Sequence, residues 1–422
     1  MEFRKKSAEA WRRVRTACAA LVKRRNPAEY FIVLALIGMT VFVVRALAGG
    51  PAAFEGLFFM RSRDMLYDFV NPLRDAAQGV AAYTERHVLY PPLGNLLLRL
   101  IGRLLPAEYL NTADEDFYTW RDYNAVILVY LLLTLVAFAW IAARLAREEH
   151  PTPRRSLLLF CLLCGFPFVF WLERGNAVLF IVPLLLIYAQ NYDSEKAWVR
   201  EVGLIALALA FALKLYPALF GVVLLTDRRF KEAIRCAVYA LALLILPSFA
   251  YGGPVILWNM VRNVGRFSYY SSGRAEAFYH SFGIPASVIS ALLIPAFVLL
   301  IAFLIAFAFV CRKRHLTLAV AAAVMVCVPS VFSCYNMMLT AMPLVLFLRQ
   351  KELRTPRDFL WFFALALPFA AFLDYPASDY LNIVCIALLY AAALWELIGT
   401  LIENKKAARG AENEQPAADE AT

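Results

Sequence analysis

Charged residues are scarce in this chain: they make up 18% of its 422 residues, whereas hydrophobic residues make up 62%. A soluble protein of this length needs a larger polar surface, so the composition excludes an ordinary soluble enzyme. No internal repeat relates the two halves of the sequence, which weakens a transporter built from repeated bundles. Apart from the segment between Gly49 and Tyr123, no polar stretch is long enough to form a separate globular domain.

Lysine is missing from every segment that we predict to lie outside the membrane. The lysines fall at the chain ends and in short basic turns between apolar runs, with Lys214 as the exception. The net charge of +10 would suggest nucleic acid in a soluble protein. Here the basic clusters are better explained by the positive-inside rule and by contact with anionic lipid, so we expect no nucleic-acid partner.

The apolar runs recur at the length needed to cross a hydrocarbon core of about 30 Å. They predict an all-α polytopic membrane protein with about 12 membrane segments, in a bacterial inner (plasma) membrane, with both termini in the cytoplasm. Residues 1–27 are predicted to form a basic amphipathic segment followed by an uncleaved first span. The membrane domain then covers residues 28–403 with an outer loop at 49–122, and the Ala/Glu-rich residues 404–422 are predicted to be disordered.

Charge decides how the ambiguous runs are interpreted. Leu89–Leu105 carries Arg99 and Arg103, which are costly in lipid, so we predict a helix lying in the outer interface. Val202–Thr226 lies between two basic turns and contains Pro217, so we predict a helical hairpin with Lys214 at its tip. The remaining predicted spans are Tyr30–Val44, Tyr123–Ala143, Ser156–Trp171, Ala177–Ala189, Ile234–Ala250, a return span ending at Arg312, Leu316–Val331, Met337–Phe347, Phe359–Phe372 and Leu381–Ile402.

The outer loop carries carboxylates at helical spacing. Asp64 and Asp68 would share one helix face, with arginines nearby that keep a carboxylate ionised. Such a carboxylate suits a general base or a metal ligand, although a solvated acidic face gives the same pattern. Lys214 is equally ambiguous, because a lysine in an apolar run either serves a buried site or extends its ammonium to the interface.

Several motifs, taken in order, resemble the GT-C superfamily of membrane glycosyltransferases, and most closely glycosyltransferase family 87, the polyprenol-phosphate-mannose-dependent alpha-mannosyltransferases. The similarity extends over residues 28–350. It includes the tract A-L-A-F-A-L-K-L-Y-P around Lys214 and the triplet Arg174-Gly175-Asn176. The outer-loop matches are Asp64, Tyr67, Gly79, Tyr83 and Tyr90-Pro91-Pro92-Leu93.

The resemblance implies a GT-C-like helical bundle that transfers a single hexose, mannose or similar. The donor would be a polyprenyl-phosphate sugar and the acceptor a lipid or glycan on the outer face of the membrane. It implies Asp64 as the general base of an inverting reaction. A leaving lipid phosphate needs fixed cations, for which the candidates are Lys214, Arg63 and Arg174. The candidate substrate-binding residues are Asp68, Tyr67, Tyr83, Tyr90, Asn176 and His280.

The sequence also departs from the family. A late Ser-Trp-His-like pattern is replaced by the segment from Pro329 to Asn336, and Tyr279-His280-Ser281 stands where an Asn-Gln-Ser-like element is expected. The pair Asp114 and Asp116 has metal-ligand spacing, but it sits in an acidic loop, and solvation of that loop is the better explanation. We therefore expect no cofactor, and the sequence gives no support for a divalent metal. The absence of a glycine-rich nucleotide loop agrees with a lipid-linked donor.

Two other functions are compatible with a multi-span protein. A surface-glycan polymerase or ligase usually has its large outer loop late in the chain, whereas here the largest loop comes first. A lipid or solute transporter favours charges in the middle of several spans, whereas Lys214 stands nearly alone in this respect. Both alternatives remain open at the level of sequence.

Overall fold

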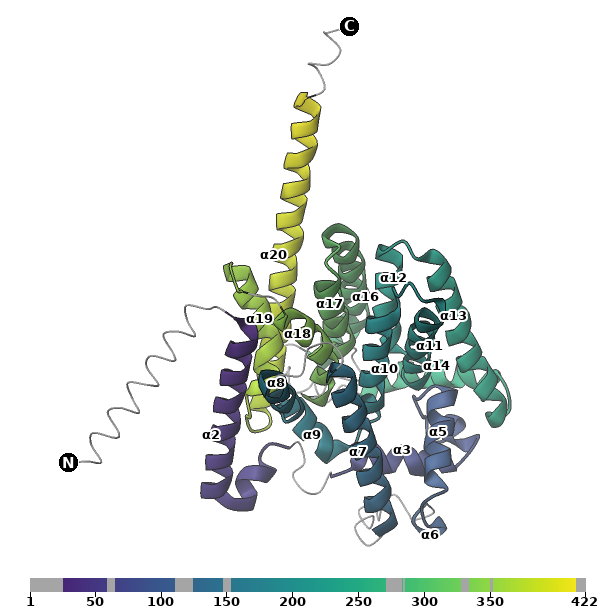
Figure 1. Ribbon diagram of the computed structural model, residues 1–422. Helices are drawn as coiled ribbons and strands as arrows, with labels where there is room; N and C mark the ends of the chain where they lie inside the picture. Colours follow the sequence, from purple (N-terminus) through teal and green to yellow (C-terminus); the bar gives the residue numbers. More distant parts are fainter. Residues whose placement is uncertain are drawn as a thin grey trace, which may run out of the picture.

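The computed structural model describes residues 26–58, 65–110, 124–146, 153–270, 283, 285–327, 334–349 and 352–414. Within these residues every regular element is a helix, and none is a strand (Figure 1). The expectation of an all-α protein is therefore confirmed.

Four helical units are long and apolar enough to cross a membrane. They are α2 (Pro27–Glu55), α7 (Asn124–Ala146), α13 with η4 (Phe230–Ile245 and Leu246–Tyr251), and α20 (Ala377–Glu414). A fifth candidate is the pair α8 (Pro153–Leu163) and α9 (Phe166–Arg174), whose axes are bent by 44°. By length and composition, the described residues thus contain four or five candidate spans. The expected count of about 12 segments is not reached by this criterion.

The bend between α8 and α9 falls inside the predicted span Ser156–Trp171. Gly165 caps the start of α9 and Pro167 follows it, so the hydrogen-bond ladder of α8 cannot continue across the junction. A Cβ at Gly165 would lie 3.0 Å from the backbone oxygen of Phe369, which shows how closely the bend packs against α19 (Pro356–Ala370). The predicted span Ser156–Trp171 is therefore made of two short helices.

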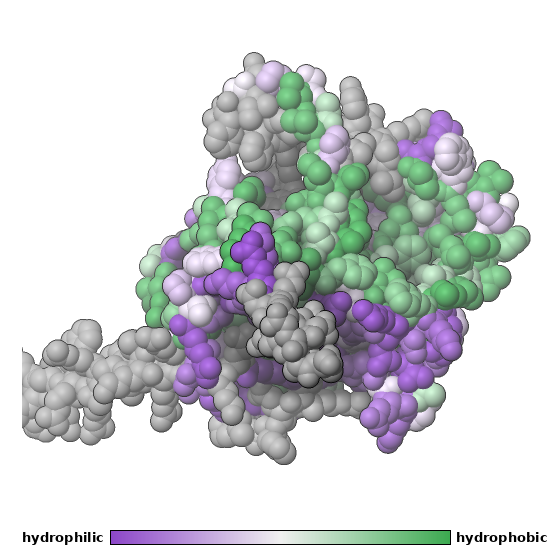
Figure 2. All heavy atoms as spheres, turned by 90° about the horizontal axis from the view of Figure 1, so that it is seen from above, coloured by the Kyte–Doolittle hydropathy of each residue, from purple (hydrophilic) through white to green (hydrophobic). Residues whose placement is uncertain are grey.

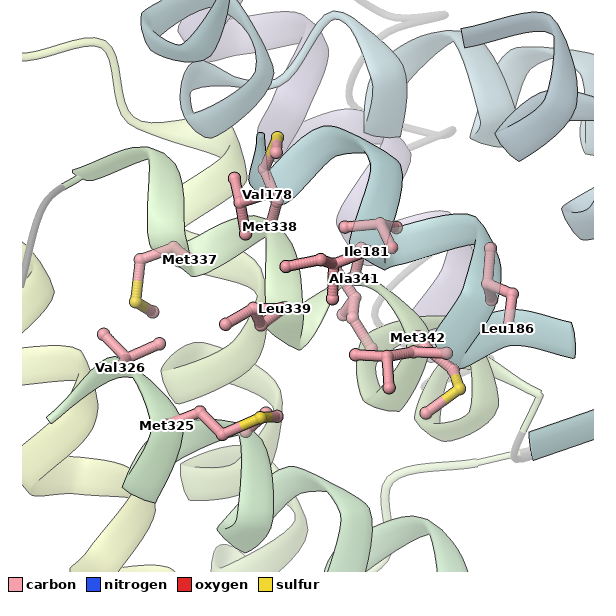
Figure 3. Close-up of a cluster of buried hydrophobic side chains, with 14 of the residues drawn as sticks. Val178, Ile181, Leu186, Met325, Val326, Met337, Met338, Leu339, Ala341 and Met342 are labelled. Atoms are coloured by element: carbon pink, nitrogen blue, oxygen red, sulfur yellow. The ribbon is translucent and has the colours of Figure 1, made fainter. Parts of the chain in front are cut away.

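Several further apolar helices fill the bundle. They are α10 (Val178–Asn191), α11 (Ala197–Leu213), η3 (Tyr216–Gly221), α12 (Val222–Thr226), α16 (Ala286–Cys311), α17 (Arg314–Val326), η5 (Cys334–Thr340) and α18 (Ala341–Leu348). Every residue of α17 from Leu316 to Val326 is buried, which identifies it as a central helix. Its end packs against η5 and α18, and η5 in turn packs against α10, in a methionine-rich cluster that includes Met325, Met337 and Met342 (Figure 3).

The segment after α2 forms short helices instead of a membrane span. They are α3 (Tyr67–Ala77), α4 (Ala81–Thr84), α5 (Pro92–Gly102) and α6 (Ala107–Leu110). In Figure 1, α3, α5 and α6 lie together at the lower end of the bundle, and α20 projects from the upper side. Helix α5 corresponds to the centre of the predicted interfacial helix Leu89–Leu105. It buries Gly94, Asn95 and Leu98 and exposes Leu97 and Leu100.

The surface is divided between apolar and polar areas. Seen from above, wide hydrophobic areas lie beside hydrophilic patches (Figure 2). Exposed apolar side chains are frequent on α2, α7 and α13, with Leu47, Leu128 and Ile234 as examples. Such contiguous exposed apolar surface is what a protein surrounded by lipid presents.

Helix α20 continues into the polar C-terminal segment. The composition after Asn404 predicts disorder, yet the helix extends to Glu414. Alanine, glutamate, lysine and arginine dominate this stretch and all have high helix propensity, which accounts for the extension. Residues 401–409 are exposed, so nothing among the described residues covers this end of the helix.

Candidate functional site

A polar cluster forms where α3 meets the junction of α9 and α10. Asp68, on the first turn of α3, accepts a hydrogen bond from Arg174 Nη2 at 2.5 Å through Oδ1. Its Oδ2 accepts from Asn176 Nδ2 at 2.9 Å and from the Tyr335 hydroxyl at 2.8 Å. The Asp68 and Arg174 side chains are only 15% and 13% exposed. Residues from three distant parts of the chain thus converge on one carboxylate.

Asn176 lies between this carboxylate and Lys214. Its Oδ1 accepts a hydrogen bond from Lys214 Nζ at 2.7 Å and another from the backbone N–H of Val178 at 3.1 Å. Its Nδ2 also donates to the Tyr335 hydroxyl at 2.9 Å. The amide therefore joins the loop carboxylate to the lysine of the predicted hairpin.

Lys214 stands at a break between two helices, as Pro217 predicts. It caps the end of α11 in an extended conformation, and η3 begins two residues later. Its ammonium lies 5.5 Å from the ring centroid of Tyr90 and 5.8 Å from that of Tyr216, distances at which cation–π attraction operates. Lys214 is half-buried, so its charge is close to the site but not sealed in the core.

Two glycines allow the backbones to approach at this place. Gly175 ends α9 with φ of 72°, and a Cβ there would lie 2.7 Å from the Cβ of Phe69 on α3. Gly94 of α5 would meet the backbone oxygen of Leu213 at 2.9 Å, directly before Lys214. Larger residues would push α3 away from α9 and α5 away from α11, which would open the cluster.

The chain that leads into α3 is also anchored to α9. The Leu66 N–H donates to the backbone oxygen of Glu173 at 2.6 Å, and Leu66 holds a left-handed conformation with φ of 59°. This conformation is strained for leucine and persists only where the surroundings enforce it. The position of the residues just before α3 is therefore tied to the same α9 terminus that supplies Arg174.

The electrostatics of the cluster are dominated by burial. Burial raises the pKa of the Asp68 carboxyl above its usual range, while hydrogen bonds from Asn176 and Tyr335 and the charge of Lys214 oppose this shift. A second carboxylate, Glu173, is buried beside the cluster, and neither of its oxygens has a hydrogen-bond partner among the described residues. The site thus combines two cations with a carboxylate that is held by several donors.

Four of the residues predicted from the sequence form one connected cluster. Asp68 bonds directly to Arg174 and Asn176, and Asn176 joins it to Lys214. Tyr67 and Tyr90 line the same place, since Arg174 lies 5.4 Å from the Tyr67 ring and Lys214 lies over Tyr90.

Tyr83 is set slightly apart. Its hydroxyl donates to the backbone oxygen of Tyr90 at 3.0 Å, and its buried ring packs edge-on against Tyr251. Asp64, Arg63 and His280, and the acidic pair Asp114 and Asp116, lie outside the described residues.

Two tyrosines of the site were not predicted. Tyr335 belongs to η5 and bonds both Asp68 and Asn176. Tyr216 is buried beside Lys214, and its hydroxyl has no hydrogen-bond partner among the described residues. Tyr335 lies in the segment that departs from the family pattern, and this departure is the feature that could have pointed to it. Tyr216 could have been found from its position in the break Lys214-Leu215-Tyr216-Pro217.

The arrangement is suited to holding an anion next to a hydrogen-bonded carboxylate. Two of the three N–H groups of Lys214 have no hydrogen-bond partner in the part of the chain that the structure describes. In a partly desolvated site, such donors interact more strongly with a negative group than they would in water. Over the described ranges, no group of three or more His, Cys, Asp or Glu side chains is placed to hold a metal ion.

Comparison with known proteins gives one match. The sequence model described as glycosyltransferase family 87 matches residues 88–340, which is more than half of the chain. The matched range contains Arg174, Asn176, Lys214 and Tyr335, and Asp68 precedes it. No curated protein and no solved structure matches the chain.

Proposed function

The chain belongs to glycosyltransferase family 87, and from this premise we propose that it transfers a single hexose, mannose or a similar sugar, from a polyprenyl-phosphate donor. The acceptor is a lipid or glycan on the outer face of the membrane. The family and the apolar helices make the protein a membrane glycosyltransferase. The donor, the acceptor and the side of the membrane are the proposal.

The observation that carries this proposal is the position of Lys214. It stands at a helix break beside the polar cluster around Asp68, and two of its N–H groups have no partner among the described residues. When a lipid-linked sugar is transferred, the bond between the anomeric carbon and the phosphate oxygen breaks, and the phosphate keeps the electron pair. Fixed cations stabilise the charge that develops on this leaving group. Lys214 supplies such a cation, and Arg174, which is hydrogen-bonded to Asp68, adds a second one.

The acceptor needs a base. Its hydroxyl oxygen forms the new bond to the anomeric carbon, in an inverting displacement, and its proton passes to a carboxylate. We assign this role to Asp64, two residues before the anchored Leu66. The rival, Asp68, already accepts three hydrogen bonds, and a carboxylate offers about four acceptor positions. We assign to Asp68 the task of holding Arg174 and Asn176.

The remaining candidates are placed around this reaction. Arg63 is a further candidate for the donor phosphate, and His280 for the acceptor. Tyr67 and Tyr90 present ring faces near the two cations and are suited to packing against a sugar or lipid. Tyr83 acts through the Tyr90 backbone that its hydroxyl holds.

Transfer is tested directly with purified protein in liposomes that contain a radiolabelled polyprenyl-phosphate hexose. Mass spectrometry of lipid-linked and envelope glycans from a strain lacking the gene identifies the acceptor in parallel. We expect donor-dependent transfer of one hexose and the loss of one glycan species in the deletion strain. Unchanged glycans together with no transfer from any polyprenyl-phosphate hexose would contradict the proposal.

The membrane topology is part of the proposal, with about 12 membrane segments and both termini in the cytoplasm of a bacterial inner membrane. Cysteine labelling tests it at two exposed positions, Glu85 in the outer loop and Lys405 near the C-terminus. We expect an impermeant thiol reagent to label Glu85→Cys, but not Lys405→Cys, in intact cells, with the unsubstituted protein as control. Labelling of Glu85→Cys only after the inner membrane is broken would reverse the assignment.

A further inference from the structure

Asn176 is a buried amide in which every hydrogen-bonding position is used. Its two N–H groups donate to Asp68 and to the Tyr335 hydroxyl, and its oxygen accepts from Lys214 and from the Val178 N–H. A side-chain amide has two donors and two acceptor lone pairs, so this pairing is complete. The side chain of Asn176 has no position left for a sugar hydroxyl unless one of these bonds breaks.

The orientation of the amide is fixed from both sides. If the amide turned over, its NH₂ group would face the Val178 N–H and the Lys214 ammonium, and its oxygen would face the Asp68 carboxylate. Each of these contacts would bring two donors or two acceptors together, which is costly in a buried site. The carboxylate of Asp68 and the backbone at the start of α10 therefore determine that the oxygen points toward Lys214.

Lys214 depends on this oxygen for its position. Among the described residues the Asn176 oxygen is the sole hydrogen-bond acceptor of its ammonium. The rings of Tyr90 and Tyr216 lie close to it, and the Asp68 carboxylate attracts it through charge without a hydrogen bond. Ring faces attract a cation without fixing its direction. The long side chain of lysine otherwise has many rotamers, so a single strong acceptor decides where its remaining N–H groups point.

We propose that Asn176 is a positioning residue for Lys214: it transmits the orientation imposed by Asp68, Tyr335 and the Val178 N–H to the ammonium, whose two open N–H groups then face the donor phosphate. This inference rests on the proposed function and adds to it the residue that preorganises the cation. Preorganised donors stabilise a developing charge without having to move during the reaction, and a misplacement of about 1 Å can cost about 10²-fold in rate.

A double-mutant cycle tests this inference with full-length protein in liposomes. Transfer from a polyprenyl-phosphate hexose and binding of polyprenyl phosphate without sugar are both measured. Asn176→Ala is expected to lower kcat/KM by about 10- to 100-fold and to raise both KM and the Kd for polyprenyl phosphate. In a Lys214→Ala background the same substitution is expected to add less than about twofold, because it acts through Lys214.

Tyr335→Phe is the second variant of the cycle. It keeps the ring that packs against Phe170 and removes only the hydroxyl that bonds Asp68 and Asn176. We expect a smaller loss, about tenfold or less, that also disappears in the Lys214→Ala background. This variant decides the question if Asn176→Ala does not purify as a monodisperse protein.

Tyr192→Phe is the matched control, because it removes the partly buried hydrogen bond that the buried Tyr192 donates to Asp227, just beyond the other end of α10. Its effect should be the same in both backgrounds, with KM unchanged. If Asn176→Ala behaves like this control, losing activity by the same factor in both backgrounds with KM and Kd unchanged, the positioning role is wrong.

The two readouts separate the two proposals. Hexose transfer by the wild-type protein with additive effects in the cycle would overturn the role of Asn176 and leave the proposed function standing. Coupled effects on polyprenyl-phosphate binding, with no hexose transfer by the wild type, would support the role of Asn176 and overturn the proposed function.

Discussion

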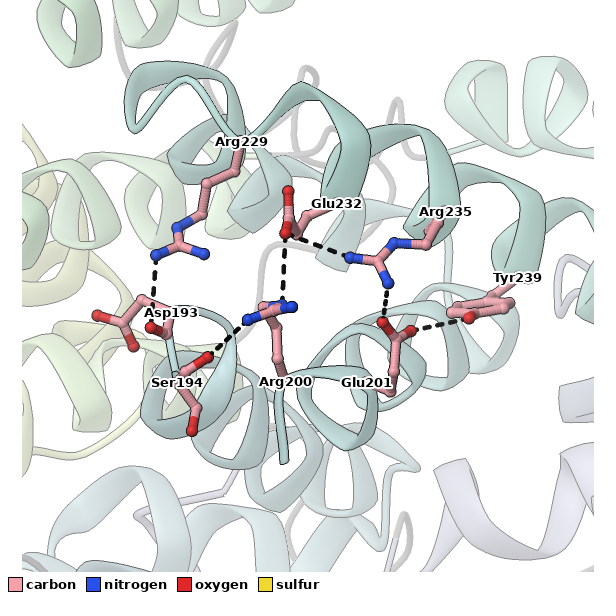
Figure 4. Close-up of polar contacts among 8 residues, drawn as sticks. All are labelled: Asp193, Ser194, Arg200, Glu201, Arg229, Glu232, Arg235 and Tyr239. Atoms are coloured by element: carbon pink, nitrogen blue, oxygen red, sulfur yellow. Dashed lines mark hydrogen bonds and ion pairs between the residues drawn. The ribbon is translucent and has the colours of Figure 1, made fainter. Parts of the chain in front are cut away.

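Helices α10 and α11 carry charged and polar clusters at both of their ends, and the two clusters differ in kind. At one end, near the turn between the helices, Glu232 pairs with Arg200 and Arg235, and Glu201 pairs with Arg235 and accepts from Tyr239 (Figure 4). At the other end lies the cluster of Asp68, Arg174, Asn176, Lys214 and Tyr335. The length of α10, 14 residues, separates them by about 20 Å.

The cluster near the turn between the helices, which we call the arginine network, pairs two cations, Arg200 and Arg235, with two anions, Glu201 and Glu232. Its arginine and glutamate side chains are partly exposed, for example 40% for Arg235 and 25% for Glu201. Pairs of this kind, partly in contact with solvent, contribute about 0.2–1 kcal/mol each. The network therefore ties the start of α11 and the turn before it to α13, and each of its two arginines is paired with a carboxylate.

The other end is organised around a single carboxylate and leaves a cation with open donors. Asn176 uses all four of its hydrogen-bonding positions, and Asp68 accepts three hydrogen bonds of about four. Lys214, in contrast, uses only one of its three N–H groups among the described residues. The comparison teaches that the number of charges does not identify a site. What distinguishes this end is a half-buried lysine with open N–H groups beside a buried amide whose own hydrogen bonds are complete.

The largest effect is expected from Asp64→Asn. Asparagine has nearly the same shape but cannot take up the acceptor proton, so transfer should fall by about 10²- to 10⁴-fold while the protein inserts and binds the donor. Transfer rates and polyprenyl-phosphate binding are measured on the same preparation.

Asp68→Asn is the comparison variant for this prediction. It should be less harmful, because we assign Asp68 to holding Arg174 and Asn176. A wild-type rate for Asp64→Asn together with an inactive Asp68→Asn would move the base to the buried cluster. Full activity of both variants would remove the outer loop from the chemistry.

Lys214→Ala comes next. Loss of one preorganised donor to a developing charge typically costs about 10²- to 10³-fold in turnover, and we expect a loss in this range. Lys214→Arg should retain part of the activity, since it keeps the charge. A normally expressed Lys214→Ala protein with full turnover would mean that the ammonium merely extends to the membrane interface, and the difference between the two helix ends would disappear.

The smallest effect is expected at the arginine network. Glu201→Gln weakens the contact with Arg235 but keeps an oxygen for Tyr239, so stability should fall by about 1 kcal/mol or less and turnover should stay within about twofold. The midpoint of thermal denaturation and the transfer rate are measured on one preparation. A loss of activity comparable to that of Lys214→Ala would show that this end also takes part in the reaction.

Part of this site could be predicted from the sequence. Pro217 interrupts the apolar run Val202–Thr226, and a single span cannot begin and end on the same side of a membrane. Both observations predict the helix break at Lys214, and in the structure α11 ends at Leu213. Arg174, Asn176 and Asp68 were also selected, each from a local motif. The sequence does not predict the bend between α8 and α9, because an apolar run reveals only its length and composition, and neither property shows how Gly165 packs against Phe369.

The sequence by itself determined the class of the protein: apolar runs with few charges require helices in lipid, since backbone groups there must be paired within each segment. It also determined the family, through motifs that are local in the chain. Only the tertiary structure decided that Asn176 joins Asp68 to Lys214 and that Tyr335 completes the cluster. The Asp68 and Tyr335 positions are 267 residues apart, and such contacts depend on how α3, α9, α11 and η5 pack, which no local pattern encodes.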